Sequence, residues 1–461
     1  MSDRGKGGVQ GIEPGTLTPI EQRRGMSRLF CFAVFNSLSF EIIGGQILIL
    51  FARQVGASLM QIGLLVSFAP FASIIQLAVA PLVTRFGPKA VMFTGWTART
   101  VAAAFLLGVP WVAGRHGPAG ATLMLLGIMA LFYLFRALGM SSWLPLLQEI
   151  VPPGLRGDFL GKQEILRHLS IIAASLLTAV YLLGVGDLGP FLHVIAVGVL
   201  CAAVGLAFLS GIPHVEPSGA AIDREFFRQA IRPLRDATFR HYLLFAWTLR
   251  FAMMSLPAFV VLFLRDAMHL GPSAVLFITT LSSAGAAASL IGWGPAIDRF
   301  GSKPVLLIGL AGMVAVALLW ATIEPTAWML RGVAPAAAFL HGVCNAGVFV
   351  ALMGLELELI PREGREHYVA ASVTLAGIAG GLSPLMVGAL LHALEQTTWH
   401  LGPVALGAYR VYFLATALLL LPPLALRPSL KEKPRPNLRR ALRVGLERGR
   451  RRAWARLRAP R

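Results

Sequence analysis

Four ionisable residues, Glu41, Arg99, Arg136 and Arg250, interrupt long apolar stretches of this 461-residue chain. If these stretches cross a membrane, such charges are costly and indicate function. A carboxyl group withdrawn from water favours its protonated form and can carry a proton. An unpaired guanidinium group in a cavity attracts an anion. We therefore predict that Glu41 is a proton-coupling residue and that Arg136 and Arg250 contact an anionic or strongly polar solute. Internal pairing, such as Glu41 with Arg136, is the alternative.

Uncharged and weakly basic polar side chains in the same stretches extend this set. They are candidate substrate-binding residues: Asn36, Gln76, His168, His341 and Asn345. For each of them, a hydrogen bond between two helices is the alternative role. Because these positions fall on different helical faces, only some of them can reach one cavity.

Composition identifies the elements that must position these residues. The chain is 56% hydrophobic and 14% charged, whereas a soluble chain carries about 25% charged residues. The apolar residues form blocks of about 20, the length that crosses a hydrocarbon core of about 30 Å. The sequence therefore predicts an all-α membrane protein with about twelve transmembrane helices, at 29–51, 59–83, 90–110, 121–147, 163–186, 190–211, 241–264, 273–297, 304–323, 333–359, 369–393 and 408–426.

The distribution of Lys and Arg predicts the orientation. The loops after the even-numbered spans hold 13 of them and the odd-numbered loops hold five, which places both termini and the central loop in the cytoplasm. We expect five parts: an N-terminal tail (1–28), two six-helix halves (29–211 and 241–426), a central loop (212–240) and a basic C-terminal tail (427–461).

The two halves carry an internal repeat. Residues 82–89 resemble 296–303, residues 55–58 resemble 270–273, and residues 149–152 resemble 358–361. The offsets, 214, 215 and 209, are nearly equal, and each match falls in the corresponding loop of its half. Two six-span halves related in this way are typical of transporters.

One repeated loop resembles the signature of the major facilitator superfamily, Gly-x-x-x-Asp-Arg-x-Gly-x-Lys/Arg. The second copy is intact, whereas the first has Ala80 and Thr84 in place of its Gly and Asp. A second signature pairs a Glu with an Arg seven residues later. The resemblance implies a cytoplasmic gating latch formed by Arg85, Gly87, Lys89, Glu149, Arg156, Gly294, Asp298, Arg299, Gly301, Lys303, Glu358 and Arg365. A loop that only fixes topology is the alternative.

The resemblance also bears on function. It implies the major facilitator fold, and residues 145–157 resemble the sugar-porter branch, although the motif expected after span 6 is absent. Arg99 falls in the third span, which in this fold lies outside the cavity. The sequence carries no Walker motif, protease motif or metal-binding cluster, so we expect no enzyme activity, no cofactor and no metal. We predict a proton-coupled secondary transporter of a small polar or anionic solute, located in a bacterial inner membrane. A transporter-like scaffold, assembly factor or lipid-handling protein is the alternative.

The basic segments outside the spans suggest lipid contacts. The C-terminal tail holds 14 Lys and Arg against two acids, which is typical of a segment that lies on an anionic lipid surface. Residues 225–232 have the pattern of a short amphipathic helix. Basic residues beside membrane spans do not indicate nucleic acid, and we expect no nucleic-acid partner.

Overall fold

The computed structural model describes residues 18–184, 187–213, 232–361, 364–397, 399–401 and 404–426. This part of the chain is almost wholly helical, apart from one antiparallel hairpin of β1 (Trp399–Leu401) and β2 (Val404–Leu406). The predicted helix at 225–232, except its last residue, and the basic C-terminal tail lie outside the described residues.

Eleven apolar helical segments are long enough to cross a membrane, and one of them crosses twice. That segment, Pro88–Ile150, has 63 residues; a straight helix of this size would be about 95 Å long, three times the apolar thickness of a bilayer. Its direction reverses at Gly117, whose φ of 68° and ψ of −176° are not helical. The described chain therefore makes twelve crossings, as predicted.

The first half is built from helices on both sides of this reversal. It starts at a capping box, in which the Thr18 side chain accepts from the Glu21 backbone N–H and Glu21 bonds back to Thr18. Its helices are α1 (Pro19–Gly44), α2 (Gln46–Val55), α3 (Leu59–Phe86), α4 (Pro88–Ala104), the 3₁₀ turn η1 (Phe105–Gly108), α5 (Val109–Met140), α6 (Trp143–Ile150), η2 (Pro153–Leu155), α7 (Arg156–Tyr181) and α8 (Leu188–Ser210).

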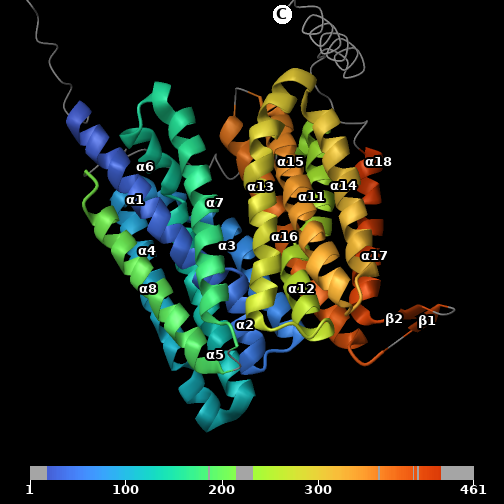
Figure 1. Ribbon diagram of the computed structural model, residues 1–461. Coiled ribbons are helices and arrows are strands. Elements are labelled where there is room, and N and C mark those ends of the chain that lie inside the picture. Colours follow the sequence, from blue (N-terminus) through green and yellow to red (C-terminus); the bar gives the residue numbers. More distant parts are fainter. Residues whose placement is uncertain are drawn as a thin grey trace, which may run out of the picture.

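The second half repeats the arrangement. Its described helices are α10 (Arg232–Arg235), α11 (Ala237–Met253), α12 (Leu256–Leu262), the π turn η3 (Phe263–Ala267), α13 (Pro272–Phe300), α14 (Ser302–Thr322), the π turn η4 (Met329–Val333), α15 (Ala334–Leu359), α16 (Arg365–Leu394), α17 (Ala408–Leu419) and α18 (Leu421–Leu426). The described chain begins and ends on the same face, at the top of Figure 1. That this face is cytoplasmic remains a prediction from the Lys and Arg distribution.

The repeated loop has the same backbone turn in both halves. Gly87 separates α3 from α4 with a φ of 81°, and Gly301 separates α13 from α14 with a φ of 89°. Only glycine adopts this conformation without strain. The preceding helix also ends alike, because Arg85 lies over the Phe86 ring and Arg299 over the Phe300 ring, each 5.2 Å from the ring centroid.

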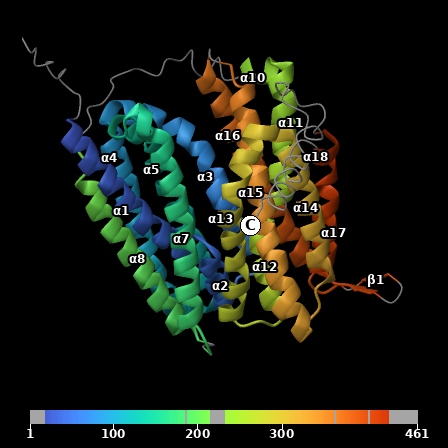
Figure 2. The same cartoon turned by 45° about the horizontal axis from the view of Figure 1, so that its top comes forward.

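The two halves meet along two helix pairs, α3 with α16 and α7 with α13 (Figure 2). Small residues allow the first pair to pack closely. A Cβ atom on Gly63 would lie 2.4 Å from the Pro384 carbonyl oxygen, and one on Gly377 would lie 2.8 Å from the Pro70 carbonyl oxygen. The glycines of span 11 therefore serve close contact between the halves.

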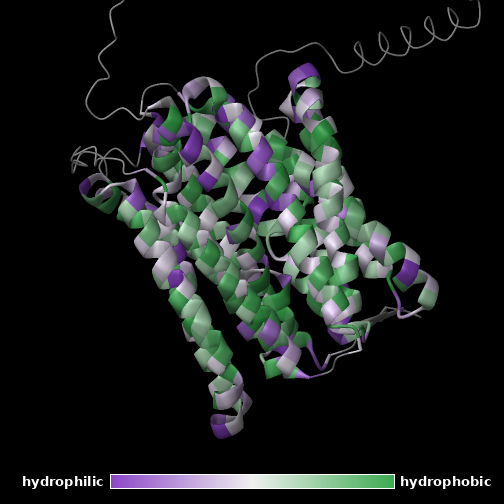
Figure 3. Ribbon diagram, turned by 60° about the vertical axis from the view of Figure 1, so that its left-hand side comes forward, coloured by the Kyte–Doolittle hydropathy of each residue, from purple (hydrophilic) through white to green (hydrophobic). Residues whose placement is uncertain are grey.

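Large apolar side chains cover the outside of the bundle. Leu177 is 70% exposed and Ile291 is 82% exposed, and apolar colour covers most of the helical ribbon in Figure 3. Side chains of this kind favour hydrocarbon over water. The described chain is thus a multi-pass integral membrane protein.

Candidate functional site

The first span is broken in its middle at two glycines. α1 ends at Gly44, α2 begins at Gln46, and Gly45 between them has an extended conformation, with a φ of −98° and a ψ of −151°. A Cβ atom on Gly45 would lie 2.4 Å from the Glu41 carbonyl oxygen, so a larger residue would not fit without a shift. The break places the start of α2 inside the membrane region.

The Glu41 side chain lies at this break and packs within the first half. It is 7% exposed, and its carboxylate accepts a hydrogen bond from the Ser175 hydroxyl of α7 at 3.1 Å. Its carboxylate also lies beside the backbone of Gly45, since a Cβ atom on Gly45 would be 2.8 Å from one carboxylate oxygen. A carboxylate is stabilised at a helix N-terminus. Among the described residues, no basic side chain lies within 4.0 Å of this carboxylate, so the alternative pairing with Arg136 is not formed.

Arg99 and Arg136 lie among aromatic rings. Arg99 is fully buried, with its guanidinium carbon 5.2 Å from the Trp96 ring centroid and 5.0 Å from that of Phe132. None of its three nitrogen atoms has a hydrogen-bond partner among the described residues. Arg136 lies over the Phe40 ring at 4.6 Å. Contact with a ring face stabilises a guanidinium group, so both charges remain inside the first half.

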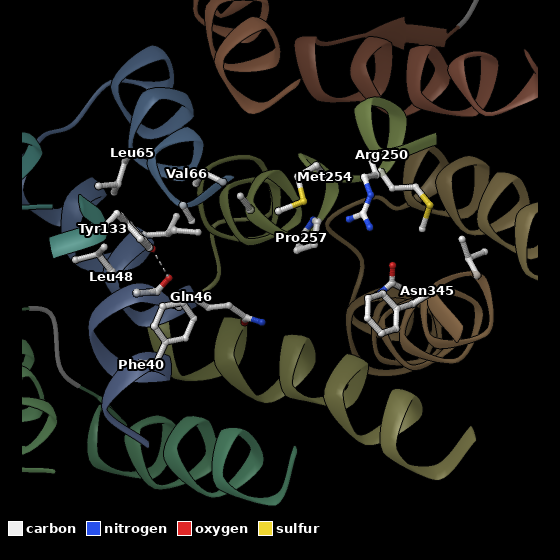
Figure 4. A pocket seen from close by; sticks show the side chains of 18 of the residues that line it. Phe40, Gln46, Leu48, Leu65, Val66, Tyr133, Arg250, Met254, Pro257 and Asn345 are labelled. Atoms are coloured by element: carbon white, nitrogen blue, oxygen red, sulfur yellow. Dashed lines mark hydrogen bonds between the residues drawn. The ribbon is translucent and has the colours of Figure 1, made fainter. Parts of the chain in front are cut away.

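A cavity of about 470 Å³ lies where the two halves meet. Figure 4 shows Arg250, Met254 and Asn345 on the side formed by the second half, and Phe40, Leu48, Leu65, Val66 and Tyr133 on the opposite side. The Tyr133 hydroxyl donates to the Gly44 carbonyl oxygen at 3.1 Å and holds that ring beside the break. The complete lining is Phe40, Gly44, Gly45, Gln46, Leu48, Ile49, Leu65, Val66, Ala69, Tyr133, Leu249, Arg250, Met253, Met254, Pro257, Ala258, Asn345, Val348, Phe349 and Leu352.

A second cavity of about 340 Å³ adjoins the first and shares Ala69, Arg250 and Met254 with it. Glu356 of α15 lines this second space, and its carboxylate accepts from the Tyr242 hydroxyl at 3.0 Å. The sequence alone does not single out Glu356, because an acid near the end of a span is ordinarily interfacial. A signal was available: Glu356 and Asn345 are eleven residues apart, about three helical turns, and therefore share a face.

The structure brings only part of the predicted substrate-binding set to the cavity. Arg250 and Asn345 line it, and His341 lines a small neighbouring space with Gln46. Asn36 instead accepts from the indole N–H of Trp96 at 2.8 Å and thereby joins α1 to α4. The remaining predicted positions are absent from the lining of all three spaces: Gln76, Arg136 and His168.

His168 has partners on its own helix. Its Nε2 atom lies 3.4 Å from a Glu164 carboxylate oxygen and 3.1 Å from a guanidinium nitrogen of Arg167. Arg167 itself is paired with Glu164. These contacts favour a structural role for His168 on α7 over contact with a solute.

The first copy of the predicted latch makes contacts within its own half. Lys89 donates to the Ile212 carbonyl oxygen at 2.5 Å. Arg156 donates to the carbonyl oxygens of Val151, at 3.1 Å, and Gln148, at 2.7 Å, which lie at the end of α6. It therefore neutralises the negative end of that helix, and Glu149 is exposed.

The second copy is similarly placed at the end of α13. Asp298 and Arg299 are exposed, and a Cβ atom on Gly294 would meet no atom within 4 Å. Gly294 therefore does not provide a close helix contact in this arrangement of the halves. The gating role of Gly301, Lys303, Glu358 and Arg365 with these residues stays a prediction.

Ion pairs join the halves at the opposite face, away from the described chain ends. Arg53, at the end of α2, pairs with Asp266 of η3 at 2.9 Å and with Glu395 beyond α16 at 3.3 Å. Arg265 donates to the Gln54 side chain at 2.8 Å. Arg53 follows the first span of its half, and Arg265 and Asp266 follow the first span of theirs, so these charges occupy corresponding loops of the repeat. The halves are thus held together at the bottom of Figure 1, the face opposite the described chain ends.

Twelve crossings in two repeated halves, with a cavity of mixed polarity at their junction, are the architecture typical of secondary transporters. Residues 242–461 match the sequence model of the family described as Major Facilitator Superfamily. No curated protein matches the chain. The family match covers the second half of the chain, and the likenesses to solved structures described next extend the same fold over both halves.

Solved structures share the fold over most of both chains. A variant of the nucleoside transporter NupG aligns with a TM-score of 0.68 and 14% identity, over 88% of this chain and 100% of that one. The D-xylose-proton symporter has a TM-score of 0.64 and 15% identity, over 87% and 97%. The E. coli fucose:proton symporter FucP has a TM-score of 0.57 and 15% identity, over 90% and 99%.

Proposed function

We propose that this protein moves a small polar or anionic solute across a bacterial cytoplasmic membrane by proton symport. The observation that carries the proposal is the cavity at the junction of the halves, lined by Arg250 and Asn345 and bordered by the break beside Glu41. A cavity between two repeated halves can open to either face in turn when the halves rock against each other.

The ion pairs of Arg53 provide the closure of one face that one state of such a cycle requires. They hold the two halves together on the face opposite the ends of the described chain, so solute in the cavity would exchange through the other face. If these pairs broke and the face that carries the predicted latch closed, the cavity would open to the opposite side of the membrane. We propose that the predicted latch residues, including Asp298 and Arg299, form that second closure.

Glu41 is the proposed site of proton coupling. Its carboxylate lies beside the start of α2, where Gly45 and Gln46 line the cavity. Protonation would remove the negative charge that stabilises this helix N-terminus and would weaken its hydrogen bond from Ser175. A proton on Glu41 would therefore alter the wall of the cavity itself. Two structural neighbours, a xylose-proton and a fucose:proton symporter, favour the same type of coupling.

The experiment is uptake by the purified full-length chain in proteoliposomes with an imposed inward proton gradient. A panel of labelled carboxylates, sugars, nucleosides and amino acids is tested against protein-free liposomes. We expect accumulation of at least one solute class and a loss of accumulation when a protonophore dissipates the gradient. If no class accumulates or exchanges above the protein-free level, the transport function is wrong and the scaffold alternative is favoured.

A further inference from the structure

The two walls of the cavity differ in a way that selects a substrate class. We propose that the transported solute is an amphipathic organic anion, whose carboxylate binds Arg250 while its apolar part packs against the first half. This inference rests on the proposed function and narrows it, because it excludes uncharged sugars and nucleosides.

The wall from the first half is mostly apolar. Its apolar side chains are those of Phe40, Leu48, Ile49, Leu65, Val66 and Ala69, with the Tyr133 ring, and its one amide side chain is that of Gln46, beside the backbone of Gly44 and Gly45. The Tyr133 hydroxyl is engaged with the Gly44 carbonyl oxygen at 3.1 Å, so the residue presents its ring to the cavity. A sugar with hydroxyl groups on every face would leave them unpaired against this wall, which costs free energy. An aromatic or aliphatic group would gain by burial there.

The wall from the second half carries the charge. Arg250 lines both cavities, and no carboxylate lies within 4.0 Å of its guanidinium group among the described residues. Glu356, the acid that shares the second cavity, is held by Tyr242. The guanidinium fork matches a carboxylate with two parallel hydrogen bonds, and Asn345 beside it can donate a further one.

The charges behind the apolar wall reinforce this selection. Arg136 lies over the ring of Phe40, which lines the cavity, and Arg99 lies over the ring of Phe132, which packs against the lining residue Tyr133. Neither arginine has an acidic partner within 4.0 Å among the described residues. Together with Arg250, which lines the cavity, they make three guanidinium groups in or next to its walls, against the two carboxylates of Glu41 and Glu356. One positive charge remains in excess. In a water-poor environment such an excess attracts an anion more strongly than it would in water. The cavity, at about 470 Å³, has the volume of a small-molecule site.

The test compares 2-naphthoate with its uncharged analogue 2-naphthamide, which has nearly the same shape. Binding to the full-length chain in lipid nanodiscs is measured by calorimetry. We expect naphthoate to bind about 10 to 100 times more tightly than naphthamide, the range for a charge-assisted hydrogen bond. Acetate, which lacks the apolar group, should bind at least about tenfold more weakly than naphthoate.

Variants assign this discrimination to one residue. Arg250→Gln should reduce the naphthoate-to-naphthamide ratio to about one, and Arg250→Lys should retain part of it, because the charge remains and the fork is lost. Arg115→Gln is the matched control, since Arg115 is exposed at the Gly117 turn. A ratio near one in the unmodified protein, or a ratio that persists in Arg250→Gln, would overturn the proposal.

Uptake separates this inference from the proposed function. If proteoliposomes accumulate uridine or xylose and not naphthoate, the substrate class is wrong while transport stands. If naphthoate binds with the expected discrimination and no solute of any class is transported, the site stands while the transport function is wrong.

Discussion

The first helices of the two halves are both broken in mid-span, yet they use the break differently. In the first half, the break at Gly45 turns the acid Glu41 inward, towards Ser175 of the same half. In the second half, α11 ends at Met253 and α12 begins at Leu256, and the charged residue before this break, Arg250, faces the cavity. The Ser255 and Tyr412 hydroxyl groups lie 2.9 Å apart beside it.

The first helices of the two halves are equivalent elements of the repeat, but this difference gives their charged residues two different tasks. In the proposed function, the acid Glu41 would bind a proton without touching the solute, whereas the base Arg250 would bind the solute. An internal repeat gives both halves the same backbone turns, as Gly87 and Gly301 illustrate, but it leaves each half free to place its charges. Four variants test this division of labour.

The largest effect is expected from Arg250→Gln. It removes the charge that faces the cavity, and a hydrogen bond to a charged group contributes about 1.5–3 kcal/mol. We expect initial rates of anion uptake in proteoliposomes to fall about 10- to 100-fold. Arg115→Gln, on the exposed turn, should keep the unmodified rate. Equal rates for the two variants would contradict the role of Arg250.

Glu41→Gln should affect only the part of transport that the proton gradient drives. The amide oxygen can still accept from the Ser175 hydroxyl, but the side chain no longer exchanges a proton. We expect stimulation by the gradient to disappear while solute exchange without a gradient remains. Glu164→Gln is the control, because Glu164 is another acid of the first half and is paired with Arg167 on its own helix, α7. Unchanged pH dependence in Glu41→Gln would assign coupling to another residue.

Gly45→Ala tests the break itself. Its Cβ atom would lie 2.4 Å from the Glu41 carbonyl oxygen, and such overpacking costs about 1–3 kcal/mol. We expect a lower thermal unfolding midpoint in detergent. Gly127→Ala, where a Cβ atom meets nothing within 4 Å, should be neutral or slightly stabilising, since alanine favours a helix by up to about 1 kcal/mol. The same midpoint for both variants would mean that α1 and α2 adapt freely.

The smallest effect is expected from Arg53→Gln at the closed face. The pair of Arg53 with Asp266 is partly exposed, with 23% and 21% of the two side chains accessible, so its contribution is about 0.2–1 kcal/mol. We expect a roughly one- to fivefold shift towards states open at this face, measured as distances between spin labels on the two halves. Arg410→Gln breaks a pair with Glu324 inside the second half; an equal shift there would contradict a gating role for Arg53.

The local features of the fold could be predicted from the sequence. Blocks of about twenty apolar residues fix the crossings, because the bilayer thickness sets their length. The matching loops at a nearly constant offset fix the repeat, and the turns at Gly87 and Gly301 need residues that adopt a positive φ. The break at Gly45 lies inside one apolar block, so the count of spans did not reveal it.

The composition of the site was harder to predict. Asn36 and Arg136 lie in apolar helices much as Arg250 and Asn345 do. In the structure, however, Asn36 accepts a hydrogen bond from Trp96, and Arg136 lies over the Phe40 ring. Glu356 belongs beside the cavity although it is near the end of its span. In soluble helices the polar face indicates the orientation; helices that are apolar towards both lipid and protein lack that indicator.

The sequence by itself determined that this protein crosses the membrane in two repeated halves, because span length and loop motifs are local properties of the chain. Only the tertiary structure decided which charges face the cavity. The direction of each side chain depends on the rotation and packing of its helix against neighbours that are distant in sequence. Glu41 and Arg250 illustrate the result: both are charges within membrane spans, and only packing directs the first into its own half and the second into the cavity.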